Sequence, residues 1–128
     1  MATIYFKSPE HKKRFLAALK ETGAVYEGNK IDQEYGTACY ILTADLATWQ
    51  KAQAYVGHSH IDIPEMLESV DLSSGSRTLV ELAGNLFNSQ THTEPIELMR
   101  LDENNFRVAL TGLQIRRARL HVEDVIDA

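Results

Sequence analysis

The sequence predicts an all-α fold, a compact bundle of five or six helices in one domain over residues 1–128. Three observations predict this class. Apolar residues recur three and four positions apart in several separate segments. Residues that favour helix starts precede those segments, and the connectors between them are short. The chain has 128 residues, of which 44% are apolar and 24% charged, so it can bury one core without disulfides.

The first half of the chain predicts four helices, each starting at a residue that favours the N-cap: Ser8, Asp32, Asp45 and Asp62. Pro9 suits the first helical position, and Gly23 ends the first helix. The second helix runs to residue 42, and the third stops near Gly57. Asp62 and Glu65 have the capping-box spacing for a short fourth helix. The side chains expected to face the core are Phe15, Leu16, Leu19, Tyr35, Ala38, Cys39, Leu42, Leu46, Trp49, Ala52, Met66 and Leu67.

The second half predicts two long helices and a short one between them. A helix starting at Ser74 carries an apolar stripe of Leu79, Leu82, Ala83 and Leu86. A one-turn helix spans residues 93–99. Asp102 caps the last long helix, whose expected inner face is Phe106, Ala109, Leu110 and Leu113. We expect these two stripes to pack on each other in the middle of the core, with a short acidic tail following at about 120–128.

One segment departs from the helical pattern. Residues 3–6 are rich in β-branched and aromatic side chains, and residues 24–26 could pair with them as a short N-terminal β-ribbon. Two strands alone are marginally stable, so the sequence does not decide whether this ribbon forms.

Composition restricts the function classes. With 13 basic and 18 acidic residues the net charge is −5, which argues against non-specific nucleic-acid binding as the main activity. The single cysteine, Cys39, allows no intrachain disulfide and fits a reducing compartment. The chain shows no apolar run of membrane-spanning length and no signal-peptide core, so we expect a soluble cytoplasmic protein without membrane contact.

The segment with His58 and His60 is the strongest candidate for a metal site, because a His-x-His pair followed by Asp62 can ligate a transition metal. The alternative is a polar connector in which Asp62 serves as a helix cap. The motif defines no third or fourth ligand, so the sequence favours the connector, and we expect no metal and no cofactor.

The helix start at residues 73–77 is a candidate anion site. Its backbone N–H groups, the helix dipole, the hydroxyls of Ser74 and Ser76 and the guanidinium of Arg77 could bind a phosphate. The alternative is ordinary N-capping by serine, and the chain contains no P-loop motif. A small-ligand binder or enzyme using this helix start, with His92 from the following loop, is the second functional hypothesis.

Four polar residues follow one face of the same predicted helix: Arg77, Glu81, Asn85 and Asn88. They are either a solvated face or a polar recognition stripe, and asparagine is a mediocre helix former that needs some reason to be there. Asn88 could serve as a helix C-cap.

Two short basic clusters, at residues 11–14 and 116–119, raise a third hypothesis of nucleic-acid regulation. It requires the two clusters to converge on one face, and the chain contains none of the common nucleic-acid-binding motifs. Nucleic acid is therefore not the favoured partner.

The favoured function is a non-enzymatic protein-interaction module: a small helical adaptor, regulator or inhibitor. The chain contains none of the usual hydrolase, metalloprotease or dinucleotide-binding motifs. Seven aromatic residues besides Phe15 lie within the first 55 positions, which suggests a homodimer or partner surface built from this half. They are Tyr5, Phe6, Tyr26, Tyr35, Tyr40, Trp49 and Tyr55.

The chain also resembles a small uncharacterised helical family from Gram-positive bacteria and their phages. The resembling segments are residues 5–11 with 14–15, residues 36–42, and the patterns within residues 74–88 and 101–106. The resemblance implies an all-helical fold and a bacterial or phage origin, and it transfers no catalytic residue. A phage origin would favour a role in modulating a host or defence protein.

Overall fold

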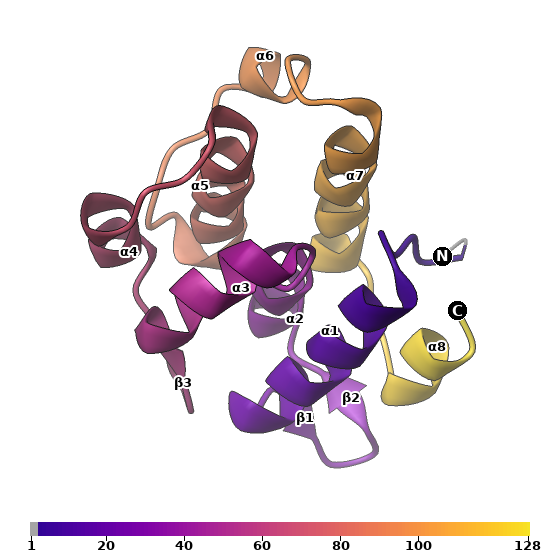
Figure 1. The fold of residues 1–128 in the computed structure, drawn as a ribbon. Helices are drawn as coiled ribbons and strands as arrows, with labels where there is room; N and C mark the ends of the chain where they lie inside the picture. Colours follow the sequence, from indigo (N-terminus) through magenta and orange to yellow (C-terminus); the bar gives the residue numbers. More distant parts are fainter. Residues whose placement is uncertain (1–2) are drawn as a thin grey trace.

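The structure is a computed structural model that describes residues 3–128 (Figure 1). Its α-helices are α1 (Pro9–Glu21), α2 (Gln33–Leu42), α3 (Leu46–Ala52), α4 (Ile63–Ser69), α5 (Ser74–Asn88), α6 (Pro95–Leu98), α7 (Glu103–Arg117) and α8 (Val122–Ile126). A 3₁₀ turn, η1 (Gln53–Tyr55), follows α3. The strands are β1 (Val25–Tyr26), β2 (Lys30–Ile31), β3 (Val56–Gly57) and β4 (His60–Ile61). The mostly helical fold class is confirmed. Six of these helices have seven or more residues, and α6 and α8 are shorter.

Helix starts follow the predicted capping residues. Five caps accept a hydrogen bond from the backbone N–H three residues further on: Ser8, Asp32, Asp62, Ser73 and Asp102. Each bond satisfies an amide that the helix leaves without a partner. Asp45 is the N-cap of α3 but makes no such bond. Its carboxylate lies 2.8 Å from Nζ of Lys7, tying α3 to the N-terminal segment.

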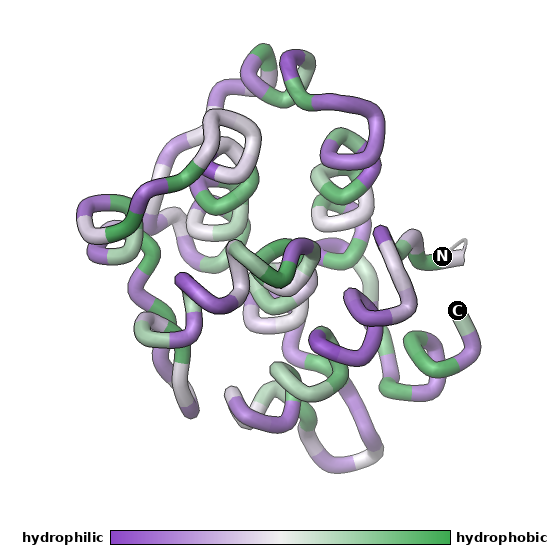
Figure 2. Tube along the Cα trace, in the orientation of Figure 1, coloured by the Kyte–Doolittle hydropathy of each residue, from purple (hydrophilic) through white to green (hydrophobic). Residues whose placement is uncertain are grey.

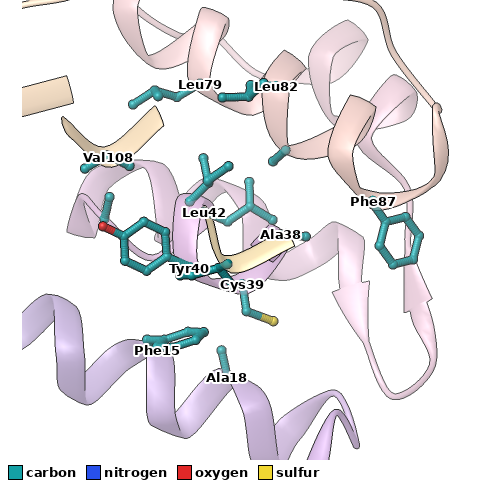
Figure 3. Close-up of a cluster of buried hydrophobic side chains, with 14 of the residues drawn as sticks. Phe15, Ala18, Ala38, Cys39, Tyr40, Leu42, Leu79, Leu82, Phe87 and Val108 are labelled. Carbon is teal, nitrogen blue, oxygen red and sulfur yellow. The ribbon is translucent and has the colours of Figure 1, made fainter. Parts of the chain in front are cut away.

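The middle of the core is α2, in which every residue from 36 to 42 is buried. This helix packs more extensively against α5 and α7 than those two pack against each other, which corrects the expected α5–α7 centre. Figure 3 shows Leu42 directed toward Leu79 and Leu82 of α5, with Cys39 and Tyr40 on the side of α1. A helix surrounded on all sides needs no polar face, which explains the continuous apolar run of its sequence.

The inner face predicted for α7 is wrong except at Ala109. Leu110 is 46% exposed and Leu113 is 36% exposed, whereas the buried residues are Val108, Ala109, Thr111, Gly112 and Ile115. Close packing on α2 is the reason. A Cβ added to Gly112 would lie 2.8 Å from Cδ1 of Ile41, so small residues occupy the interface.

The apolar stripe of α5 is confirmed at Leu79, Leu82 and Ala83, while Leu86 is half-buried. On α3, Trp49 and Ala52 are buried as expected. Leu46 was expected inside but is 54% exposed, because it occupies the first position of a short helix that packs through its later residues.

The ribbon forms, but with a different partner. Residues 3–6 are not a strand, and β1 pairs with β2 in an antiparallel hairpin. Gly28 and Asn29 take the positive φ values of +80° and +60° that tight hairpin turns require. Closing this short loop costs less entropy than recruiting a strand some twenty residues away. A second hairpin, β3–β4, has the same place before α4 that the first has before α2.

The acidic segment at about 120–128 is part of the fold and contains α8. Leu120 and Val125 are buried. The backbone of Ile31 donates to the carbonyl of Leu120, and that of Val122 donates to the carbonyl of Asn29, both at 2.9 Å. The segment therefore continues the edge of the first hairpin. Burial of its apolar side chains stabilises it in the fold despite its acidic composition.

The aromatic residues of the first half are mostly core, so they leave little surplus apolar surface there. Tyr40 and Trp49 are buried, and the ring of Phe6 packs against Phe15 and Tyr40. Of the seven aromatic residues named in that half, Tyr26 is the one that is more than half exposed.

Candidate functional site

Several polar groups of the helix start at residues 73–77 make hydrogen bonds within the fold, although Ser74 and Arg77 are exposed. Oγ of Ser73 accepts from the backbone of Ser76 at 3.2 Å and donates to its hydroxyl at 3.0 Å. The backbone carbonyl of Ser74 accepts from the hydroxyl of Thr78. Nη1 of Arg77 donates to the carbonyl of Leu67 at 3.3 Å, joining α5 to α4. These contacts are those of a capped and braced helix start.

The polar stripe of α5 does not converge on one site. Nδ2 of Asn85 donates to the carbonyl of Thr91 at 3.0 Å and holds the loop after α5. Asn88 is the exposed last residue of the helix, and the cap with a left-handed backbone is Ser89 rather than Asn88. Arg77 and Asn88 are eleven residues apart, about 16 Å along the helix.

His92 lies in the exposed loop after α5. Its Nε2 lies 3.0 Å from Oε1 of Glu94, and this hydrogen bond raises the pKa of the imidazole. The pair belongs to the surface, where such contacts contribute little to stability.

His58 and His60 lie on the second hairpin, both exposed. The ring of His58 packs over Gly23, where an added Cβ would come within 2.6 Å of Nε2. The backbone of Ser59 donates to the carbonyl of Thr22, so the hairpin turn docks on the end of α1. In the part of the chain that the structure describes, no group of three or more His, Cys, Asp or Glu side chains is placed to hold a metal.

Most of the two basic clusters is engaged in backbone contacts. Arg14 donates to the carbonyls of Thr43 and Ala44, and Nε of Arg116 donates to the carbonyl of Leu86 at 2.7 Å. Lys12 donates to the carbonyls of residues 126 and 128. His11 is fully buried. The side chains left facing solvent are Lys13, Arg117 and Arg119.

Three buried titratable groups serve the core rather than chemistry. Burial lowers the pKa of His11 to about 4, and the backbone hydrogen bond to Tyr40 opposes that shift. Burial raises the pKa of the Cys39 thiol to about 12, so this cysteine is not a nucleophile at neutral pH. Burial also raises the pKa of Tyr40, whose hydroxyl donates to the backbone carbonyl of Tyr5.

Helix α7 has an exposed apolar face that the periodicity of the sequence alone predicts to be a core face. Phe106, Leu110 and Leu113 follow each other at i, i+4 and i+7, on the side opposite the buried Val108 and Ile115. Phe106 is half-buried and the two leucines are exposed. Figure 2 shows the hydrophobic segments along this helix. The periodicity was visible in the sequence, but it was assigned to the core.

Two cavities at the junction of α7 and α8 were also missed. The lining of the larger, of about 840 Å³, includes Arg117 and Arg119 together with Asp124 and Asp127. The smaller, of about 340 Å³, lies beside the first hairpin and includes Tyr26. Arg119 and Leu120 line both cavities. The two arginines were visible in the sequence only as part of a basic cluster.

The fold and these surfaces define a mostly helical domain with an exposed apolar helix face and a charged cavity. The chain belongs to a family of unknown function (DUF6075), whose family model matches residues 1–119. This confirms the expectation of an uncharacterised family, and α8 lies beyond the matched residues. No curated protein and no solved structure matches the chain. None of the helices in residues 3–128 has the length and apolarity needed to cross a bilayer.

Proposed function

We propose that this chain is a non-enzymatic protein-interaction module, a small helical adaptor, regulator or inhibitor that binds a partner protein through the outward face of α7. The observation that carries the proposal is the exposure of Leu110 and Leu113 in line with Phe106. Apolar residues at i, i+4 and i+7 on an exposed helix face are typical of helices that bind in the groove of a partner.

The partner is a different protein with a complementary apolar groove. A stable homodimer interface buries about 800 Å² on each copy. Three partly exposed side chains on α7 supply only part of such an area. Ile96 and Met99 add exposed apolar surface around α6, at 60% and 59% exposure, next to the start of α7 in the chain. This arrangement favours a modest interface with another protein over an obligate dimer.

Support for the alternatives is weaker. The polar groups at residues 73–77 are braced within the fold, and most of the two basic clusters binds backbone carbonyls. The proposal places the protein in the cytoplasm, which its single, buried cysteine supports. The resemblance to Gram-positive and phage proteins adds the expectation that the partner is a bacterial protein.

Affinity capture from the native cells tests this function. The immobilised wild type is compared with the double variant Leu110→Ser/Leu113→Ser and with Leu46→Ser, which removes an exposed leucine on α3. We expect one or more proteins that the wild type and the α3 variant retain and the α7 variant loses. Identical capture by all three would overturn the proposal. A dimeric wild type that becomes monomeric in the α7 variant, measured by light scattering, would replace it with self-association.

A further inference from the structure

We propose that the larger cavity at the α7–α8 junction binds a small zwitterion, with a carboxylate or phosphate at one end and an ammonium group at the other. The cavity has a volume of about 840 Å³, which is within the range of small-molecule sites. Arg117 follows Leu113 by four residues, so the cavity adjoins the C-terminal end of the apolar face assigned above to a protein partner.

The lining of this cavity includes two basic and two acidic side chains, which come from different segments. Arg117 ends α7 and Arg119 lies in the connector, whereas Asp124 and Asp127 belong to α8 and its C-cap. Neither guanidinium is among the ion pairs of residues 3–128, which means that no described carboxylate oxygen comes within 4.0 Å of them. The two guanidinium groups therefore line the cavity without a direct ion pair to Asp124 or Asp127.

The charged side chains of the cavity keep hydrogen-bonding groups that a ligand can use. Neither guanidinium group donates a hydrogen bond to another described residue, so both planar forks can bind a carboxylate or phosphate in two-point fashion. Oδ2 of Asp124 accepts from the backbone N–H of His121 at 2.8 Å and lies 3.9 Å from Nδ1 of the same residue, whereas Oδ1 accepts no hydrogen bond from another described residue. An ammonium group is the donor that pairs with Asp124 and Asp127 together.

Apolar residues complete the cavity. Ile4 and Leu120 also line it and are mostly buried, so they contribute a small apolar part of its lining. A short aliphatic spacer between the ligand's two charges would cover this surface. Polar groups converging over an apolar base are the ordinary composition of a small-molecule site.

Nuclear magnetic resonance titration of the backbone amides of residues 114–128 tests this site. Phosphoethanolamine and 4-aminobutyrate present the phosphate and carboxylate forms of the ligand, while inorganic phosphate and ethylamine carry one charge each. We expect saturable shifts with at least one zwitterion, and binding at least about tenfold weaker for both single-charge probes. A preference between the two zwitterions identifies the anionic group.

Substitutions separate the proposed site from non-specific charge. Arg117→Gln and Asp127→Asn should each weaken zwitterion binding about tenfold. The matched controls Arg100→Gln and Asp71→Asn alter exposed residues elsewhere and should leave it unchanged. Absence of saturable shifts with both zwitterions would overturn the proposal. So would phosphate binding as tightly as phosphoethanolamine, or binding that neither cavity variant affects.

Discussion

Nε2 of His11 lies 2.8 Å from the backbone carbonyl of Tyr40, and this contact joins α1 to the central helix. Nδ1 of the same ring accepts from the backbone N–H of Lys7 at 3.1 Å. Both ring nitrogens are therefore used when the imidazole is neutral with its proton on Nε2. A second proton would cost the bond from Lys7 and would place a charge in the core.

Stability should therefore fall as the solution is acidified below neutral pH. The pKa of His11 is about 4 in the folded chain and about 6.5 when unfolded, so the unfolded state binds the extra proton first. The contribution is complete above pH 6.5 and is lost by at most about 1.4 kcal/mol per pH unit between 6.5 and 4. Urea unfolding across this range measures it. In His11→Gln this component should vanish, whereas His60→Gln, at an exposed site, should follow the wild type. Parallel curves for all three proteins would show that His11 does not titrate in this way.

Leu82→Ala should destabilise the protein by about 2–5 kcal/mol, because Leu82 is buried against α2 and its truncation leaves a cavity. Glu81→Ala changes the adjacent residue, whose side chain is partly exposed, and should have a small effect. Chemical denaturation of the two variants in parallel gives the comparison. Equal midpoints would contradict the assigned inner face of α5.

Substitutions on the two faces of α7 should change the free energy of unfolding in the reverse order from that expected from the sequence. Ile115→Ala removes a fully buried side chain and should cost about 2–5 kcal/mol. Leu110→Ala alters an exposed side chain and should cost less than about 1 kcal/mol. Thermal and urea unfolding distinguish the two. A larger loss for Leu110→Ala would restore the orientation that the sequence predicted.

Gly84 lies where α5 approaches α4. An added Cβ would be 2.9 Å from Cγ2 of Ile63, so Gly84→Ala should destabilise by about 1–3 kcal/mol despite the better helix propensity of alanine. Gly57→Ala is the control, since its Cβ would meet nothing within 4 Å. A stabilising effect at Gly84, measured by the melting temperature, would mean that α4 and α5 are not in close contact.

Cys39 should resist thiol reagents in the native protein. It is fully buried and its pKa is raised to about 12 by burial, so both access and thiolate formation are suppressed. Ellman's reagent at pH 8 should label it only in denaturant. A Cys39→Ser/Ser69→Cys variant, with the thiol on an exposed helix end, provides the reactive control. Rapid labelling of native Cys39 would be inconsistent with its place on α2.

Local interactions explain why much of the fold could be predicted from the sequence. The caps at Ser8, Asp32 and Asp102 depend on hydrogen bonds within three residues, so the sequence contains the whole interaction. The turn at Gly28 and Asn29 is equally local, since these two residue types readily adopt the positive φ values of a tight hairpin. The β-propensity of residues 3–6 nevertheless suggested a different pairing.

Tertiary contacts account for what could not be predicted. The buried face of α7 holds Ala109 and Gly112 because α2 approaches closely, so the interface resembles a weak apolar stripe and the exposed leucines resemble a core. The cavity brings together Arg117, at the end of α7, and Asp127, the C-cap of α8, which are ten positions apart. No period or motif in the sequence encodes such a separation.

Site-specific photo-crosslinking in the native cells tests the central claim, that the outward face of α7 binds a partner protein. A photoreactive benzoylphenylalanine replaces Leu113 in one variant and the similarly exposed Leu46 of α3 in the other. The proposal predicts a covalent adduct with a different protein from position 113 and none from position 46. Adducts from position 46 alone, or from neither position, would contradict it.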